Sequence, residues 1–132
     1  MSRLEFVKAH ACGNDFLVIE ETAARARYAE LARKLCERHT GIGADGIEFL
    51  ERKPDGTFFL RLFNADGSEA ELSGNGTRCV AAWLAESEGL TEMAFGTHGG
   101  RRSCKVLSRE GSTWLIESAM GRSEERRVGK EC

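Results

Sequence analysis

The sequence has little proline and no marked excess of either charge. Pro54 is the only proline among 132 residues, and no repeat or low-complexity segment precedes Gly121. No apolar run is long enough to cross a bilayer, and the first fifteen residues lack the apolar core of a secretory signal peptide. A formal net charge of -2 is not the basic footprint of a nucleic-acid-binding protein. We therefore expect one cytoplasmic domain with no nucleic-acid and no membrane partner.

The cysteines also lack a pattern. They are odd in number, widely spaced and form no C-x-x-C pair: Cys12, Cys36, Cys79, Cys104 and Cys132. This spacing argues against a zinc site, and a reducing cytoplasm would keep most of them as thiols. Cys36, on a predicted helix face, and Cys104, in a predicted strand, are expected to be small buried side chains.

Hydrophobic periodicity predicts a mixed α/β (α+β) domain with about seven short strands and two helices. The expected strands are 4–10, 16–20, 46–52, 57–63, 92–97, 101–108 and 113–119. The expected helices are 26–38, with Gly41 as its C-cap, and 76–87. Residues 64–77 form a long polar segment, which we expect to be a loop that carries function.

The last eleven residues, RSEERRVGKEC, do not fit this pattern. They contain seven charged residues, one large apolar residue and no periodicity. They resemble the translation of a common sequencing-adapter oligonucleotide. We therefore expect residues 122–132 to be non-native and residues 1–121 to be the domain; the alternative is a genuine charged tail.

A turn rich in small residues, SGNGTR, directly precedes the second predicted helix. Gly74 and Gly76 allow the backbone to approach a ligand closely, and the first N–H groups of the helix lack intrahelical partners. Such a helix end attracts an anion, and the absence of a Walker-type lysine favours a carboxylate over a polyphosphate. Two alternatives stay open: Ser73 is simply the helix N-cap, and Arg78 simply pairs with a glutamate.

Four motifs in this order and spacing carry a family resemblance: HACGNDF (10–16), GIGADG (41–46), FNADGSEAELSGNGTRC (63–79) and SAMG (118–121). Together they resemble the N-terminal half of the diaminopimelate epimerase family. The resemblance implies one lobe of a two-lobed fold, in which a β-sheet wraps around a central helix, here the one from Gly76. The C-terminal lobe, which completes the cleft, would be missing.

The resemblance also implies a reaction. Family members invert the α-carbon of an amino acid without a cofactor or metal, using two cysteines on opposite faces of that carbon. By resemblance, Asn14 and Asn64 hold the small-molecule amino-acid substrate, and the N–H groups of Gly74 and Asn75 hold its α-carboxylate. The substrate implied is LL-diaminopimelate, which is converted to the meso form in lysine biosynthesis.

The sequence departs from the family at the first catalytic position. The residue there is Ser73, and an aliphatic hydroxyl is far less acidic than a thiol, so it needs an adjacent base. Cys79 matches a second, non-catalytic family cysteine and lies well over one helical turn away. The histidines His10, His39 and His98 are expected to be surface or satisfied residues.

Three interpretations follow. The first is a diaminopimelate epimerase with Ser73 as acid/base residue, in a truncated chain that is inactive alone. We expect this chain to be marginally stable or to self-associate, with a homodimer as one form. The second is another isomerase of the superfamily, such as a phenazine-pathway enzyme or an amino-acid racemase. The third is a non-catalytic lobe that binds a carboxylate.

Overall fold

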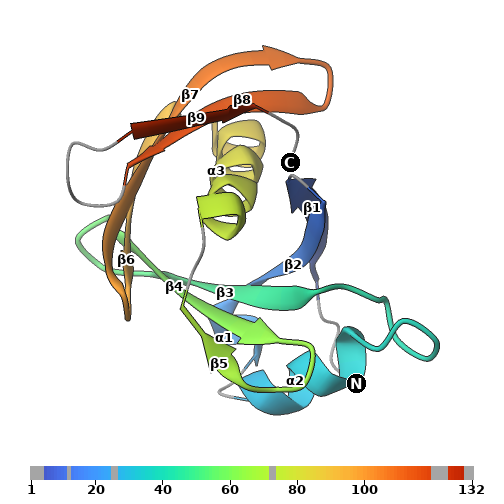
Figure 1. The fold of residues 1–132 in the computed structure, drawn as a ribbon. Helices are drawn as coiled ribbons and strands as arrows, with labels where there is room; N and C mark the ends of the chain where they lie inside the picture. Colours follow the sequence, from blue (N-terminus) through green and yellow to red (C-terminus); the bar gives the residue numbers. More distant parts are fainter. Residues whose placement is uncertain (1–4, 12, 25–26, 72–73, 120–124, 130–132) are drawn as a thin grey trace.

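The computed structural model describes residues 5–11, 13–24, 27–71, 74–119 and 125–129. Their strands form one curled sheet, which Figure 1 shows from the side. Along the sheet lie β1 (Val7–Ala11), β2 (Asn14–Glu20), β3 (Gly46–Arg52), β4 (Phe58–Asn64), β6 (Glu92–Thr97), β7 (Gly100–Glu110), β8 (Thr113–Ala119) and β9 (Glu125–Gly129). The short β5 (Glu69–Ala70) pairs with β4. The β2–β3 and β4–β6 pairs are parallel, and the others are antiparallel.

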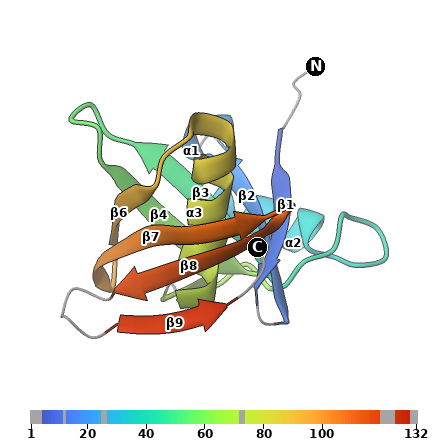
Figure 2. The ribbon, with the colours of Figure 1, turned by 90° about the horizontal axis from the view of Figure 1, so that it is seen from above.

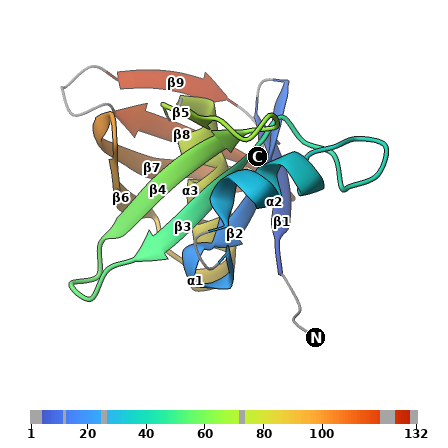
Figure 3. The same ribbon diagram turned by 90° about the horizontal axis from the view of Figure 1, so that it is seen from below.

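The sheet wraps around one helix. This helix, α3 (Gly74–Glu88), lies on the concave side of the sheet (Figure 2). Helix α2 (Tyr28–Leu35) lies on the opposite side (Figure 3), and the short α1 (Glu21–Ala24) precedes α2 in the chain. Val80, Ala81 and Leu84 of α3 are fully buried, as expected for a helix surrounded by the strands it packs on. The predicted fold, a sheet around a central helix, is confirmed.

Strand alternation divides the interior into two clusters, one on each face of the sheet. In β3, Leu50 belongs to the cluster around α3, whereas Phe49 belongs to the cluster under α2. In β2, Val18 and Ile19 divide in the same way. These strands read as nearly continuous apolar runs because both faces are covered.

The first predicted helix is shorter than expected, and Gly41 is not its C-cap. Helix α2 ends at Leu35, and Cys36 is the C-cap residue. The chain then folds back, with the N–H groups of Ile42 and Gly43 both donating to the Leu35 carbonyl at 2.9 Å. Gly41 lies inside this return: a Cβ there would be 2.8 Å from the same carbonyl oxygen. The glycine therefore permits close packing on the helix end rather than a left-handed cap.

Smaller differences concern short elements. Strand β1 begins at Val7 rather than at residue 4, and both α1 and β5 were not predicted. The backbone of residues 125–129 pairs with β8, although the sequence pattern predicts no element there. Whether that segment is native stays a prediction. No described helix is long and apolar enough to cross a membrane.

Candidate active site at one end of the sheet

Three of the four motifs meet where β2, β3 and β4 lie side by side. The parallel register pairs Phe16 with Gly46, and the antiparallel register pairs Gly46 with Asn64. Asn14, two residues before Phe16, therefore lies at the same end of the sheet as Asn64. By strand alternation both share the face of Leu62, which packs against α3. Residues far apart in sequence thus reach one place on the α3 side.

A reciprocal hydrogen-bond network fixes the first two motifs to each other. The Asp15 N–H donates to Asp45 Oδ2 at 3.1 Å, and the Asp45 N–H donates to Asp15 Oδ1 at 3.0 Å. Asn14 Nδ2 also donates to Asp45 Oδ2, at 3.3 Å. Arg38, beyond the end of α2, bridges both carboxylates through Nη2, at 3.0 Å to Asp15 and 3.1 Å to Asp45.

This network sets the charge state of Asp15. The hydrogen bonds from Arg38 hold the pKa of the Asp15 carboxyl well below its usual range, although partial burial acts in the opposite direction. Lys8 adds a cation 3.6 Å from Asp15 Oδ2. Asp15 therefore stays ionised, and the loop that carries Asn14 is tied down by charge-assisted bonds.

The NADGS segment is a tight turn that presents Asn64 at the end of β4. The Gly67 N–H donates to the Asn64 carbonyl at 2.9 Å, and the Asn64 N–H donates to the Ser68 carbonyl at 2.8 Å. The Asn64 side chain donates to Ser68 Oγ at 3.1 Å and is exposed. Bonds from Ser68 also lower the pKa of Asp66. Asn64 is thus held in place while its amide stays accessible to a ligand.

Helix α3 begins at Gly74, two residues earlier than predicted. Gly74 and Asn75 are half-buried, so their N–H groups, which have no intrahelical partner, lie at an accessible helix end. Residues 72 and 73 lie outside the described part of the chain, and the proposed role of Ser73 stays a prediction. Cys79 is fully buried within α3, which agrees with a packing role.

Two buried charged residues flank this helix start. Glu48 of β3 is 0% exposed, and a Cβ on Gly76 would lie only 2.9 Å from Glu48 Oε1. Arg78 is 5% exposed and donates from Nε to the Ile116 carbonyl of β8 at 3.1 Å. Sequence reasoning did not identify Glu48; the available signal was a single acid within an apolar strand, GIEFL.

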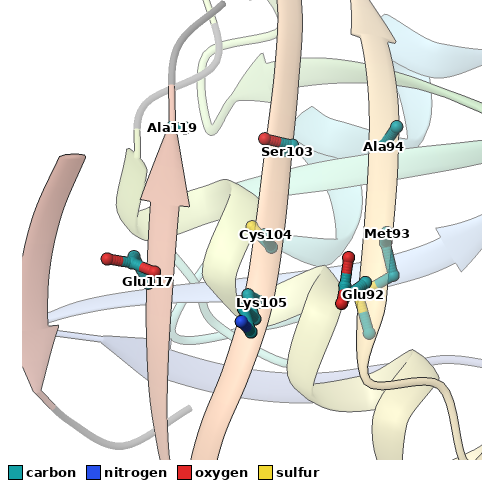
Figure 4. A pocket seen from close by; sticks show the side chains of 8 residues that line it. All are labelled: Glu92, Met93, Ala94, Ser103, Cys104, Lys105, Glu117 and Ala119. Carbon is teal, nitrogen blue, oxygen red and sulfur yellow. The ribbon is translucent and has the colours of Figure 1, made fainter. Parts of the chain in front are cut away.

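Two open hollows on the described surface differ in their relation to this site. One of ≈ 550 Å³ is lined by Lys8, His10, Asp15, Arg38 and Asp45, next to the loop of Asn14. The other, of ≈ 450 Å³, lies across β6, β7 and β8 and includes Glu92, Lys105 and Glu117 (Figure 4). Of the motif residues, only Ala119, in SAMG, lines the second. The first adjoins the site, although none of the predicted substrate-binding residues lines it.

The remaining predicted side chains behave largely as expected. Cys36 and Cys104 are buried, and burial raises the pKa of the Cys36 thiol to about 11. His10, His39 and His98 are exposed, and His98 packs edge-on against Phe59. Among the described residues, no three His, Cys, Asp or Glu side chains gather as a metal site requires.

Sequence comparisons relate the chain to one family. The profile of the family described as diaminopimelate epimerase matches residues 6–125. Diaminopimelate epimerase 1 of Nostoc sp. is 50% identical over 91 residues, which are 67% of this chain and 33% of the relative. The diaminopimelate epimerase of Methanocella arvoryzae is 35% identical over 127 residues, 92% of this chain and 45% of the relative. The chain thus spans less than half the length of these relatives.

Solved structures share the fold. A phenazine biosynthesis protein of the PhzF family from Bacillus anthracis superimposes with a TM-score of 0.67 at 19% identity, over 89% of this chain and 40% of that one. A hydroxyproline epimerase from Agrobacterium vitis gives a TM-score of 0.63 at 15% identity, over 94% of this chain and 47% of that one. At these identities the likeness concerns the fold alone.

Proposed function

The chain belongs to the diaminopimelate epimerase family, and from this premise we propose that it forms the N-terminal lobe of a cofactor-independent amino-acid epimerase. The substrate that we propose is diaminopimelate, interconverted between its LL and meso forms. The supporting observation is that Asn14 and Asn64 lie at one end of the sheet, and that Gly76 in the first turn of α3 packs against Glu48, two residues from Gly46 at that end.

In this proposal the described residues bind and orient the substrate. The N–H groups of Gly74 and Asn75 hold the α-carboxylate and stabilise the charge that develops when the α-proton leaves. The amides of Asn14 and Asn64 bind the remaining polar groups of the substrate. Ser73 occupies the first acid/base position, and the second acid/base group comes from the C-terminal lobe.

The test is exchange of the α-proton in heavy water. We expect no deuterium uptake into diaminopimelate by the 132-residue chain alone, because half of the cleft is supplied by a second lobe. Residues 1–121 would then be joined to the C-terminal part of the Nostoc relative, with Ser73 and with the Ser73→Cys substitution. Mass spectrometry of diaminopimelate measures the uptake.

The two chimeras test the epimerase scaffold and the role of Ser73 separately. Uptake by the Ser73→Cys form alone would support the epimerase scaffold and show that the hydroxyl limits the reaction. Uptake by both would support Ser73 as an acid/base residue. If both chimeras fold and neither takes up deuterium into diaminopimelate, the proposal is wrong. Ser73 favours another isomerase of the superfamily as the second candidate, which uptake into a different amino acid would support.

A further inference from the structure

The first turn of α3 lies between two buried, oppositely charged side chains. We propose that Glu48 and Arg78 are positioning residues that hold this turn and tune its affinity for a carboxylate. The inference rests on the proposed function, since it concerns the same N–H groups of Gly74 and Asn75. We call these two side chains the charged clamp.

Glu48 packs on the turn from the side of β3. The neighbouring strands place Val18 and Leu62 beside it in register, and both belong to the apolar cluster around α3. Both carboxylate oxygens lie close to Gly76, at 2.9 and 3.2 Å from the position of a Cβ on that residue. A side chain at position 76 would therefore displace the carboxylate or the helix start.

Arg78 packs on the same turn from the side of β8. Its Nε bond to the Ile116 carbonyl anchors the guanidinium in the core. Its Nη1 reaches back to Asn75 Oδ1 at 3.5 Å and lies 3.0 Å from the position of a Cβ on Gly74. A charged group thus approaches both Gly74 and Gly76 so closely that a side chain at either position would collide with it. Neither glycine has a positive φ, so the close approach, and not the backbone conformation, requires glycine there.

The two charges act in opposite directions on a bound anion. In this proposal Glu48 is ionised and opposes an anion at the helix start, whereas Arg78 and the helix dipole favour one. Removal of the Glu48 charge should therefore raise the affinity for a carboxylate, and removal of the Arg78 charge should lower it. A role limited to supporting the fold would weaken binding in both variants.

The charge test uses the ¹⁵N-labelled 132-residue chain, with acetate as the probe at constant ionic strength. The amide signals of Gly74, Asn75 and Gly76 report binding. We expect Glu48→Gln to tighten acetate binding by roughly three- to tenfold and Arg78→Met to weaken it by a similar factor. Glu117→Gln, on the outer face of β8, is the control and should leave the affinity unchanged.

Changes of equal sign in the two variants, or no change, would overturn the charge role. If saturating acetate leaves the amides of the unaltered chain unshifted, the carboxylate site fails, and the charge role fails with it. The positioning role is then decided by a measurement that needs no ligand.

That measurement is a double-mutant cycle on stability. Gly76→Ala should lower the urea midpoint, and the loss should shrink in a Glu48→Ala background, where the added methyl group has room. The control cycle pairs Gly99 with Glu71, because a Cβ on Gly99 would also lie 3.0 Å from a glutamate side chain, but an exposed one. Equal losses in both backgrounds at Gly76 would overturn the clamp.

Discussion

At the scale of single residues, Asp15 is held by several partners although it lies outside the core. It accepts hydrogen bonds from Arg38 and from the Asp45 N–H, and its side chain is 21% exposed. Because Arg38 is itself largely exposed, its ion pair alone contributes little to stability. Its function is geometric: it holds the HACGNDF and GIGADG segments together, and with them the amide of Asn14.

A pH prediction follows from the lowered pKa of Asp15. An unfolded aspartate takes up its proton near pH ~4, whereas the folded one does so at lower pH. The unfolded state therefore binds more protons than the folded state below about pH 4. The stabilisation that the folded state gains from the ionised Asp15 is complete above this pH and is lost as the pH falls further. We expect the urea midpoint of Arg38→Met to lie below that of the unaltered chain at pH 6.

The difference between the two midpoints should shrink as the pH falls from about 5 towards 2. Other acids, including Asp55 and Glu69, also have lowered pKa values and contribute to the pH dependence of both chains. The informative quantity is therefore the difference in urea midpoint between Arg38→Met and the unaltered chain. Lys34→Met, at an exposed position of α2, is the control. A constant difference across this range would contradict the assignment of Arg38 as the cause.

Motifs in the sequence suggested the proposed binding residues but not the residues that support them. Asn14, Asn64 and the GNG turn were proposed from motifs, which follow local order in the chain. Glu48 contacts α3, and Arg78 contacts β8; both contacts join residues distant in sequence. A periodic pattern in the sequence shows only that positions such as these are buried. The chemistry of a buried acid depends on what packs against it, and this requires the fold.

At the scale of elements, the sheet separates two cores. Leu84 of α3 lies in the cluster on the concave face, and Leu31 of α2 lies in the cluster on the opposite face. Both are buried, at 0% and 6% exposure, so we expect Leu→Ala to cost about 2–5 kcal/mol at each position. Because the two residues lie in separate clusters on opposite faces of the sheet, the costs should add.

Chemical denaturation of both single variants and the double variant measures this. We expect the sum to hold within about 0.5 kcal/mol, as for independent sites. As a matched control, Leu84→Ala and Val80→Ala share one cluster and should not add. Strong coupling between positions 31 and 84 would show that the two faces unfold as a single packed unit through the sheet.

The boundaries of elements were predicted less well than their existence. Strands β3, β6 and β8 have the predicted bounds because alternating or continuous apolar residues end at clear turns. The first helix was predicted too long because the apolar spacing continues through Cys36, while the chain leaves the helix to bring Arg38 to Asp15 and Asp45. A tertiary contact thus overrides the local pattern there.

At the scale of the whole molecule, the sheet ends at β9, whose backbone pairs with β8 from Leu115↔Gly129 to Ala119↔Glu125. The sequence predicts that residues 122–132 are non-native, so their deletion should leave the melting temperature nearly unchanged. It should, however, expose the backbone donors and acceptors of β8, and an unpaired edge strand promotes association with another copy.

Sedimentation velocity over a range of concentrations measures this effect. We expect the shortened chain to self-associate as concentration rises, and Leu115→Lys, a charge on the half-buried outer face of β8, to restore the monomer. A marked loss of thermal stability on deletion would instead make β9 an integral strand and weaken the expectation that this segment is non-native. Self-association that Leu115→Lys leaves unchanged would place the contact on another face, because a lysine on β8 disfavours only pairing at this edge.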